Sequence, residues 1–451
     1  MKIRTLLSGG TAVVVGLAIS VTVAPVVHAD NVTPGSFNTV KSHRILDTRS
    51  GIGAPKAPVG SGETLTFNAT ADITGPVAAV VLNVTAVAPT APGHLTVYAG
   101  GTAKPYASNL NFQAGEDVPN LVITPVAANG DVSITNGSAG TVNMLADIHG
   151  YYLGRGTATE PGTFVSMPSR RFLDTRKGIG APKARIPKRT GLTLKVAGVG
   201  GIPADASAVV ANLTAAQGTG RGYVTAYEGE PRPLASNLNY EIKEDRANLA
   251  LVAIAADGTI SLFNGGSVGN VDLVVDITGY FIGGTPVVDG SFVPSTPFRI
   301  YDSREGGKPA GALTTSKILT PGFGDPFFKA VLVNVTAVQP QEPGYLTTFD
   351  GVGPGIPSVS SSNFRPKHDV AGAVVLPVNP DGTISIYNGS YGNVDLVVDI
   401  AGFYIAPPVA TLARMGAATP STDQRIGQAL AALKQFSKSP HSTPVSVTTT
   451  K

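Results

Sequence analysis

The sequence predicts an all-β protein made of three tandem antiparallel β-sandwich or barrel-like repeat domains, with a short C-terminal helix. Three observations support this fold class. One long segment occurs along the chain in three similar copies. Its informative stretches read as short strands separated by Gly and Pro turns, and no amphipathic helix of three turns falls inside a repeat.

The repeat is clearest where each copy begins. The run Arg-Ile-Leu-Asp-Thr-Arg at 44–49 returns as Arg-Phe-Leu-Asp-Thr-Arg at 171–176 and as Arg-Ile-Tyr-Asp-Ser-Arg at 299–304. An Asn-Val-Thr-Ala-like run and a closing Asp-Ile-x-Gly-aromatic-aromatic run follow in the same order in every copy. We therefore place the three β repeats at 34–154, 161–284 and 289–406, with short joints between them.

The elements inside one repeat are predicted as strands. Residues 77–87 are β-branched and largely apolar, as expected of a strand buried on both faces. Residues 131–135, 259–263 and 383–387 alternate polar and apolar side chains, and each follows an Asn-Gly or Asp-Gly hairpin signal. Each repeat is long enough to fold alone. The alternative is a pseudo-threefold assembly whose repeats share strands, and the sequence leaves both open.

The two ends of the chain differ from the repeats. Residues 1–29 combine a basic head, an apolar run and the triplet Val27-His28-Ala29, which predicts a secretory signal peptide cut before Asp30, with a membrane anchor as the rival interpretation. Residues 421–436 have a capping box and an apolar face, and predict a short amphipathic helix that docks on the last repeat or on another protein. Residues 437–451 are rich in Ser, Thr and Pro and predict a disordered tail.

Composition excludes several classes of function. The chain of 451 residues has no Cys, which excludes disulfides, thiolate metal sites and Cys nucleophiles. Its formal charge of +3 falls to +1 once Lys2 and Arg4 leave with the signal peptide (3 − 2 = 1). A nearly neutral chain without a basic block does not attract a phosphate backbone, so we expect no nucleic-acid partner. After signal cleavage we expect no membrane span.

A search for catalytic groups leads to a non-enzyme prediction. The six His do not recur at equivalent repeat positions, and no His-Glu-x-x-His pair is present, so we expect no metal and no cofactor. The run Gly-Gly-Ser-Val-Gly at 265–269 has the spacing of a nucleophile elbow, but it lies in a turn between two strands rather than before a helix. We interpret that match as chance.

One polar pattern recurs in all three repeats and marks the candidate site. Each copy places an Asp and an Arg two residues apart near its start, at Asp47 and Arg49, Asp174 and Arg176, and Asp302 and Arg304. An Arg fork holds a carboxylate or backbone carbonyls through parallel hydrogen bonds. The pattern favours a structural clamp on the following Gly-rich loop, because an active site needs only one good copy. The alternative is a ligand contact to sugar hydroxyls or a carboxylate.

Each repeat closes with two adjacent aromatic residues, which point to opposite faces of a strand. One ring of each pair should enter the core. The other ring is a candidate to stack on a sugar, or it packs between repeats, and we assign this position to Tyr152, Phe281 and Tyr404. A lone Asp precedes each pair, at Asp147, Asp276 and Asp399, and a Ca²⁺ ligand is a weak alternative for it.

Taken together, the Leu-Asp-Thr-Arg, Asn-Val-Thr-Ala, Gly-x-Leu-Thr, Ser-x-Leu-Asn and Gly-Tyr-Phe-like runs resemble a tandem repeat of secreted actinobacterial proteins. In that family the repeat is often appended to exported hydrolases of the cell wall or of polysaccharides. The resemblance covers about residues 34–406 and implies an extracellular, non-catalytic module with no particular ligand. The third repeat departs from it at Tyr301 and Ser303, and its Ser-x-Leu-Asn run is degraded at 360–364.

These observations leave three hypotheses about function. The first is a secreted, non-catalytic β-repeat protein, extracellular or associated with the cell surface, that binds polysaccharide or another cell-envelope component through three similar weak sites. The second is a structural or assembly protein whose β faces pack against other protein subunits. The third and least favoured is a hydrolase with an unfamiliar site.

Overall fold

The computed structural model describes residues 35–154, 162–283, 290–305, 307–320, 323–351, 355–406, 424–428 and 431. The predicted signal peptide, the joints at 155–161 and 284–289, and the predicted tail at 437–451 lie outside the described residues. We refer to the first, second and third units as the described parts of 35–154, 162–283 and 290–406.

The all-β prediction is confirmed, because the described residues contain 24 strands in six four-stranded antiparallel sheets. The first unit contains β1 (Phe37–Asp47), β2 (Thr64–Asn68), β3 (Val77–Val87), β4 (Gly93–Ala99), β5 (Leu110–Phe112), β6 (Val118–Pro125), β7 (Asp131–Asn136) and β8 (Asn143–Leu153). The second contains β9 (Phe164–Asp174), β10 (Thr190–Lys195), β11 (Ala206–Ala216), β12 (Gly222–Tyr227), β13 (Leu238–Tyr240), β14 (Arg246–Ala253), β15 (Thr259–Asn264) and β16 (Asp272–Ile282). The third contains β17 (Ser291–Asp302), β18 (Thr315–Leu319), β19 (Phe328–Val338), β20 (Gly344–Phe349), β21 (Ser362–Phe364), β22 (Val370–Pro377), β23 (Thr383–Asn388) and β24 (Asp395–Ile405).

The same strand order is used three times. In the first unit the inner sheet has the order β1-β8-β3-β6 and the outer sheet has the order β2-β7-β4-β5, and the other units repeat this arrangement. Apolar side chains from both sheets of a unit meet in one hydrophobic cluster. Two such sheets with this order form an eight-stranded jelly roll. Every sheet takes its four strands from one unit, so within the described residues the units do not share sheets.

The strand β3 shows why the middle of each repeat is apolar on both faces. Val80, Leu82 and Val84 point into the core between the two sheets of the first unit. The alternate residues Ala79 and Val81 point the other way, into a second cluster that all three units share. Because side chains of a strand alternate between faces, a strand placed between two cores must be apolar at nearly every position.

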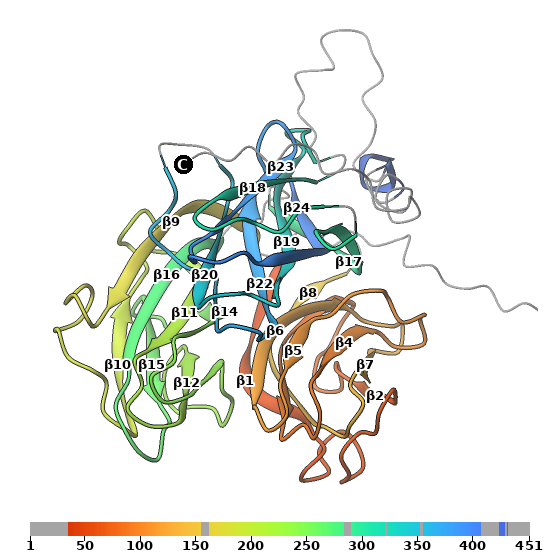
Figure 1. Ribbon diagram of the computed structural model, residues 1–451, viewed down its shortest axis with the longest axis horizontal. Helices are drawn as coiled ribbons and strands as arrows, with labels where there is room; N and C mark the ends of the chain where they lie inside the picture. Colours follow the sequence, from red (N-terminus) through yellow and green to blue (C-terminus); the bar gives the residue numbers. More distant parts are fainter. Residues whose placement is uncertain are drawn as a thin grey trace, which may run out of the picture.

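The shared cluster lies at the centre of the molecule. Figure 1 shows the three units as lobes around this centre, with the first unit in red to orange, the second in yellow to green and the third in teal to blue. The cluster takes corresponding residues from each inner sheet, including the six rings of Phe37, Tyr152, Phe164, Phe281, Phe292 and Tyr404. The six sheets are therefore arranged around one central axis, three inside and three outside.

Backbone hydrogen bonds close the three units into a ring. The amide of Phe37 donates to Gly162 at 2.7 Å, that of Phe164 to Gly290 at 2.9 Å, and that of Phe292 to Gly35 at 2.9 Å. The last bond joins the third unit to the first through space. Gly162 has a φ of +113°, and a Cβ there would lie 2.0 Å from the Phe37 carbonyl oxygen, so the joint requires glycine.

An ionic cluster fastens the opposite end of the axis. Strand β3 pairs Ala79 with Tyr152 near the aromatic rings and Ala86 with Val118 at its other end, next to Glu116. There the three units contribute Glu116, Glu244, Arg246, Arg365 and His368. The two guanidinium groups each contact both carboxylates, so this cluster is a charge-balanced tie between units.

The predicted C-terminal helix is described only in part. Residues 424–428 and 431 are helical, and the rest of the predicted span 421–436 lies outside the described residues. Ile426 is buried in the core of the third unit. Arg425 donates to Asp325 at 2.5 Å and lies 4.5 Å from the centre of the Phe327 ring. These contacts place the described helical residues against the third unit.

Candidate functional site

The recurring Asp and Arg residues form a closed set of ion pairs in each unit. In the second unit, the side chain of Arg176 donates to both carboxylate oxygens of Asp174, each at 2.9 Å. Arg171 donates to the same carboxylate at 3.2 Å. It also makes two parallel bonds, at 2.9 and 3.0 Å, to Asp276 on β16. The set therefore joins the first strand of the repeat to its last strand.

The other two units repeat this arrangement, which we call the Arg–Asp clamp. Its members are Arg44, Asp47, Arg49 and Asp147 in the first unit and Arg299, Asp302, Arg304 and Asp399 in the third. The hydroxyl between the Asp and the second Arg also bonds to the start of the last strand. Thr48 donates to Asn143, Thr175 to Asp272 and Ser303 to Asp395.

The electrostatics of the clamp keep its charges paired. Hydrogen bonds from Arg49 lower the pKa of Asp47 to about 2, so this carboxylate is ionised at neutral pH. Burial raises the pKa of Asp276, and the paired Arg171 opposes that shift. The carboxylates of Asp47 and Asp276 accept hydrogen bonds from Arg side chains of their own unit. This geometry favours the structural clamp over a ligand contact, and it pairs Asp147, Asp276 and Asp399 with Arg44, Arg171 and Arg299.

Sequence reasoning did not find the first Arg of each clamp, namely Arg44, Arg171 and Arg299. Its carboxylate partner lies about a hundred positions further along the chain, at the far end of the repeat. The available signal was that this Arg and that Asp recur together in every copy.

For the aromatic candidates the sugar-stacking role is wrong, and the alternative, packing between repeats, is what the structure shows. Tyr152, Phe281 and Tyr404 are fully buried in the central cluster, and the hydroxyls of the two tyrosines bond each other at 2.7 Å. A sugar cannot stack on these rings without opening the ring of units. The reason is that the closing strand is covered on both faces, so the ring that leaves the core of its own unit enters the shared core.

Corresponding Asn residues tie neighbouring units together. Asn83 donates to the Ser236 carbonyl at 2.5 Å, Asn212 to Ser360 at 2.5 Å and Asn334 to Ser108 at 2.7 Å. These are the Asn residues of the Asn-x-Thr runs. The three bonds run from the first unit to the second, from the second to the third, and from the third back to the first. Each interface therefore uses the same residue types, and the differences between interfaces lie around them.

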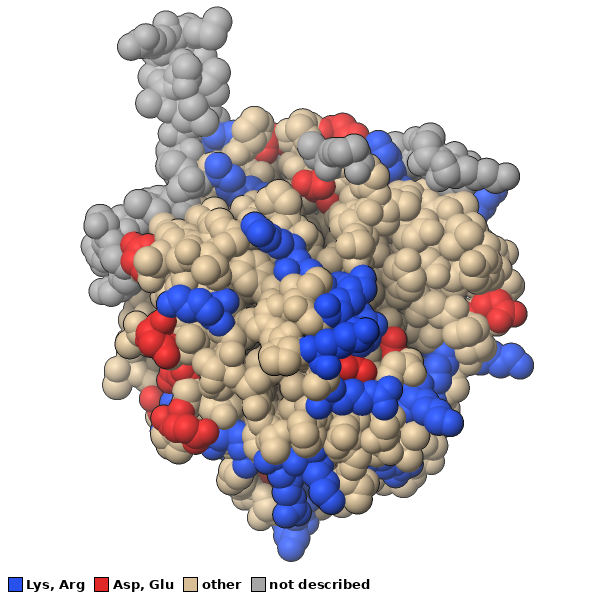
Figure 2. All heavy atoms as spheres, turned by 90° about the vertical axis from the view of Figure 1, so that its left-hand side faces the viewer, with Lys and Arg blue, Asp and Glu red and all other residues tan. Residues whose placement is uncertain are grey.

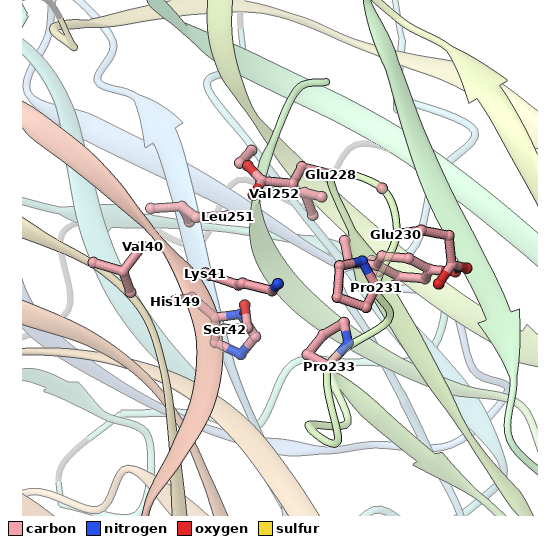
Figure 3. Close-up of a pocket in the computed structure, with 14 residues that line it drawn as sticks. Val40, Lys41, Ser42, His149, Glu228, Glu230, Pro231, Pro233, Leu251 and Val252 are labelled. Carbon is pink, nitrogen blue, oxygen red and sulfur yellow. Dashed lines mark hydrogen bonds between the residues drawn. The ribbon is translucent and has the colours of Figure 1, made fainter. Parts of the chain in front are cut away.

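The interface between the first and second units holds a small cleft of about 70 Å³. Figure 3 shows Lys41, Ser42 and His149 of the first unit on one side and Glu230 and Pro231 of the second on the other. The Oγ atom of Ser42 lies 2.8 Å from Nδ1 of His149. We call this pocket the first–second cleft.

The Ser–His pair of this cleft lacks the arrangement of a catalytic dyad. Burial lowers the pKa of His149 to about 4, so the imidazole is neutral at pH 7 and a weak base. Its second nitrogen, Nε2, is buried without a hydrogen-bond partner among the described residues, whereas a catalytic His needs a group there to orient it. The pair can accept or donate hydrogen bonds, which is binding chemistry.

Two larger pockets lie at the other interfaces. A cavity of about 400 Å³ lies between the second and third units, lined by Met167, Thr278, Phe349 and Val375 among others. A second pocket of about 350 Å³ lies between the third and first units, next to Lys104, Arg299 and Arg304. The three interfaces therefore share a plan but differ in the space and charge they enclose.

A further group of aromatic residues was not singled out by the sequence. Tyr345 and Tyr387 lie on the outer face of the β20 and β23 sheet of the third unit, with ring centres 6.3 Å apart. Tyr391 lies in the turn that follows β23, two residues after Gly389. Burial raises the pKa of Tyr387, and electrostatic interactions with Tyr345 and Tyr391 add to this shift. Tyr391 is 84% exposed and Tyr345 is 37% exposed. We call these three residues the tyrosine cluster.

The seat of Tyr345 is fixed by the turn beside it. A Cβ at Gly389 would lie 2.3 Å from the Tyr345 ring, so the ring lies directly over this glycine. His94 of the first unit and Tyr223 of the second lie over Gly137 and Gly265 in the same way. A ring packed over this glycine is common to all three units, whereas, within the described residues, a group of three tyrosines occurs there only in the third unit.

Charge is spread thinly over the surface. Figure 2 shows a face on which separate Lys and Arg side chains form a loose diagonal band, with acidic groups near its edges and wide uncharged areas between. Only 14% of the residues are charged. Among the described residues, no helix is long and apolar enough to cross a membrane, and no group of three His, Cys, Asp or Glu is placed to hold a metal ion.

Comparisons with known proteins give only distant likenesses. The sequence matches no protein-family profile and no curated protein. Similar solved structures include the tandem CBM22-1–CBM22-2 domain of Paenibacillus barcinonensis Xyn10C, at 10% identity and a TM-score of 0.18, covering 56% of this chain and 99% of that one. A Sulfolobus Turreted Icosahedral Virus structure matches at 12% identity and a TM-score of 0.17, covering 82% and 91%. The major capsid protein P2 of bacteriophage PM2 matches at 9% identity and a TM-score of 0.15, covering 55% and 97%. These TM-scores are too low to carry an inference about function.

Proposed function

We propose that this protein is a secreted, non-catalytic β protein that binds polysaccharide, or another glycan of the cell envelope, through the tyrosine cluster of its third unit. The observation that carries the proposal is the exposure of two tyrosines: Tyr345, whose ring lies beside Tyr387 on the outer sheet, and Tyr391 in the turn that follows β23. The face of an aromatic ring is electron-rich, and the C–H face of a sugar ring packs against it.

The form of the surface suits a polymer. The tyrosine cluster lies on the outside of the outer sheet, so a sugar chain can pass across it without ending in a closed pocket. The Tyr345 ring is already fixed over Gly389, so binding costs little side-chain entropy there. A weakly charged surface favours an uncharged partner over a strongly charged one.

A pull-down with insoluble polysaccharides tests the proposal. The chain without its first 29 residues is mixed with purified peptidoglycan, chitin and cellulose, and bound protein is measured after sedimentation. We expect at least one polymer to retain the protein. Replacing two stacking rings in the variant Tyr345→Ala/Tyr391→Ala should weaken that binding by about tenfold or more.

The first unit offers a matched control. The variant His94→Ala removes the ring seated over Gly137, at the position that corresponds to Tyr345, and should leave polysaccharide binding unchanged. Retention of the double tyrosine variant at wild-type level would exclude the tyrosine cluster as the binding surface. Absence of binding to every polymer, together with concentration-dependent oligomers in light scattering, would favour the assembly hypothesis instead.

A further inference from the structure

The cavity between the second and third units has no full counterpart at the other two interfaces. It lies between β9 and β16 of the second unit and β20 and β22 of the third, and has a volume of about 400 Å³. We call it the second–third cavity. Its volume falls within the range of small-molecule sites in proteins.

Two small residues of the third unit distinguish this interface, and one of them, Ala373, lines the cavity. The second unit places Asn248 and Leu249 against the first unit, and the third unit has Gly372 and Ala373 at the corresponding positions on β22. At the first–second interface the side chain of Asn248 donates to Asn83 at 3.1 Å and accepts from the Leu121 amide at 3.2 Å. Gly372 has no side chain to make such bonds.

The first unit fills its interface with the third in the same way. There Asn120 donates to Asn334 at 3.1 Å and accepts from the amide of Ala373 at 3.3 Å. At two of the three interfaces these positions thus hold an Asn bridge and a Leu, whereas the third unit presents Gly372 and Ala373 to the second–third interface. A Cβ at Gly372 would lie 3.6 Å from the Cβ of Ser362, which is an ordinary contact, so a side chain can be introduced there without a clash.

Three hydroxyl groups in the wall of this cavity lack hydrogen-bond partners. The hydroxyl oxygens of Ser169, Thr278 and Thr348 are buried and unpaired among the described residues, and all three residues line the cavity. The residues of the first unit that correspond to Ser169 and Thr278 are Ser42 and His149, which bond each other. A buried hydroxyl without a partner is costly, so a ligand that supplies one is favoured.

The charge of the wall restricts the ligand further. None of the described residues that line the cavity is Lys, Arg or His. Arg171 donates to the Ser358 carbonyl beside the wall, but its charge is paired with Asp276 and Asp174, so an anion finds no free counter-charge among these residues. The carboxylate of Asp276 is held by Arg171, and Asp350 has its own interactions within the protein. The remaining wall is largely apolar, with Met167, Leu249 and Phe349 among its residues.

From this combination of space, unpaired hydroxyls and a wall whose described residues include no Lys, Arg or His, we infer that the second–third cavity binds a small, uncharged, mostly apolar molecule that carries a hydroxyl or carbonyl group. The apolar body lies against Ala373, where the other two units have a larger Leu. Its polar end bonds the hydroxyls of Ser169, Thr278 and Thr348. This site is separate from the tyrosine cluster, so either can fail without the other.

Calorimetric titration with 1-decanol tests the inference. We expect saturable binding of one molecule per chain and a rise in melting temperature. Decanoate and decyltrimethylammonium have the same chain length but carry a charge, and should bind at least about tenfold more weakly. Equal binding of all three probes, or binding of many molecules per chain, would overturn the inference.

Variants copied from the other units locate the site. Gly372→Asn/Ala373→Leu puts the residues of the second unit into the third and should abolish 1-decanol binding without lowering the melting temperature. Thr278→Ala, which copies Ala401 of the third unit, should weaken binding about fivefold by removing one hydroxyl. His149→Thr changes only the first–second cleft and should leave 1-decanol binding unchanged. Full binding by both of the first two variants would exclude this cavity.

Discussion

The Arg–Asp clamp and the interfaces between units differ in how closely the three copies of the repeat agree. The clamp has the same residue types and nearly the same distances in all three units. The interfaces share their Asn bonds, yet the corresponding pair is Ser42 and His149 in the first unit, Ser169 and Thr278 in the second, and Pro297 and Ala401 in the third. The clamp residues, which each unit needs in order to fold, are the same in the three copies, whereas the residues at the interfaces between units differ.

The divergence has a physical consequence. A buried ion pair tolerates little change, because removing one partner leaves an uncompensated charge. An interface between two folded units tolerates more, since a small residue there leaves a space rather than a buried charge. Individual sites are therefore expected between the units, and the second–third cavity is the clearest case.

The largest expected effect is on the clamp. Removing the guanidinium in Arg171→Ala leaves the buried carboxylate of Asp276 without its partner, and should lower the free energy of unfolding by about 3–5 kcal/mol. Urea denaturation at pH 7 measures this. The exposed neighbour in Arg170→Ala is the control and should change the value by less than about 0.5 kcal/mol. Unchanged stability with weakened polysaccharide binding would reverse our assignment of the clamp.

The second prediction concerns the first–second cleft and acid. The folded pKa of His149 is about 4, below the value of about 6.5 expected in the unfolded chain. Between these two pKa values His149 is protonated in the unfolded chain but neutral in the folded chain. The free energy of unfolding is therefore unaffected by His149 above pH 6.5 and decreases as the pH falls to 4. This contribution amounts to about 3 kcal/mol.

Urea titrations at pH 7, 5.5 and 4.5 measure that loss. The variant His149→Thr copies the second unit and should lose much less stability over this range, while Asp147 and His43, the titratable groups that interact with the ring, remain in place. Parallel curves for the wild type and the variant would show that His149 does not titrate as its burial requires.

The smallest expected effect lies on the interface itself. Asn248→Gly copies the third unit into the second and leaves the side-chain oxygen of Asn83 and the amide of Leu121 without partners. We expect a loss of about 2 kcal/mol in the stability of the first–second interface. Hydrogen exchange at the Leu121 amide should become faster, whereas exchange at Ile123, on the same strand, serves as the reference. Equal exchange rates would show that the Asn bridge is dispensable.

The strands could be predicted from the sequence because their signals are local. The predicted strand at 77–87 coincides with β3, and the segment predicted at 131–135 ends one residue before β7 does. The alternation of polar and apolar residues and the Asn-Gly or Asp-Gly turns depend only on neighbouring residues, so they can be recognised without knowledge of the rest of the fold.

The candidate site could be predicted only in part, because its contacts are distant. Period-two alternation shows that Tyr151 and Tyr152 face opposite ways, but both faces of β8 are covered, and the sequence does not show that Tyr152 meets the rings of the other units. The small residues at 372–373 are visible in the sequence. That they face the second unit across a cavity depends on the closed ring.

The bond between Gly35 and Phe292 makes the ring a late product of synthesis. A chain synthesised from its N-terminus completes the first unit before its third. Until the third unit follows, the central face of the first unit, with Phe37 and Tyr152, has no complete cover. Contacts between such distant parts of a chain form slowly. The folding chain therefore passes through a stage with an exposed apolar flank, and its resistance to aggregation depends on how fast the last unit closes the circle.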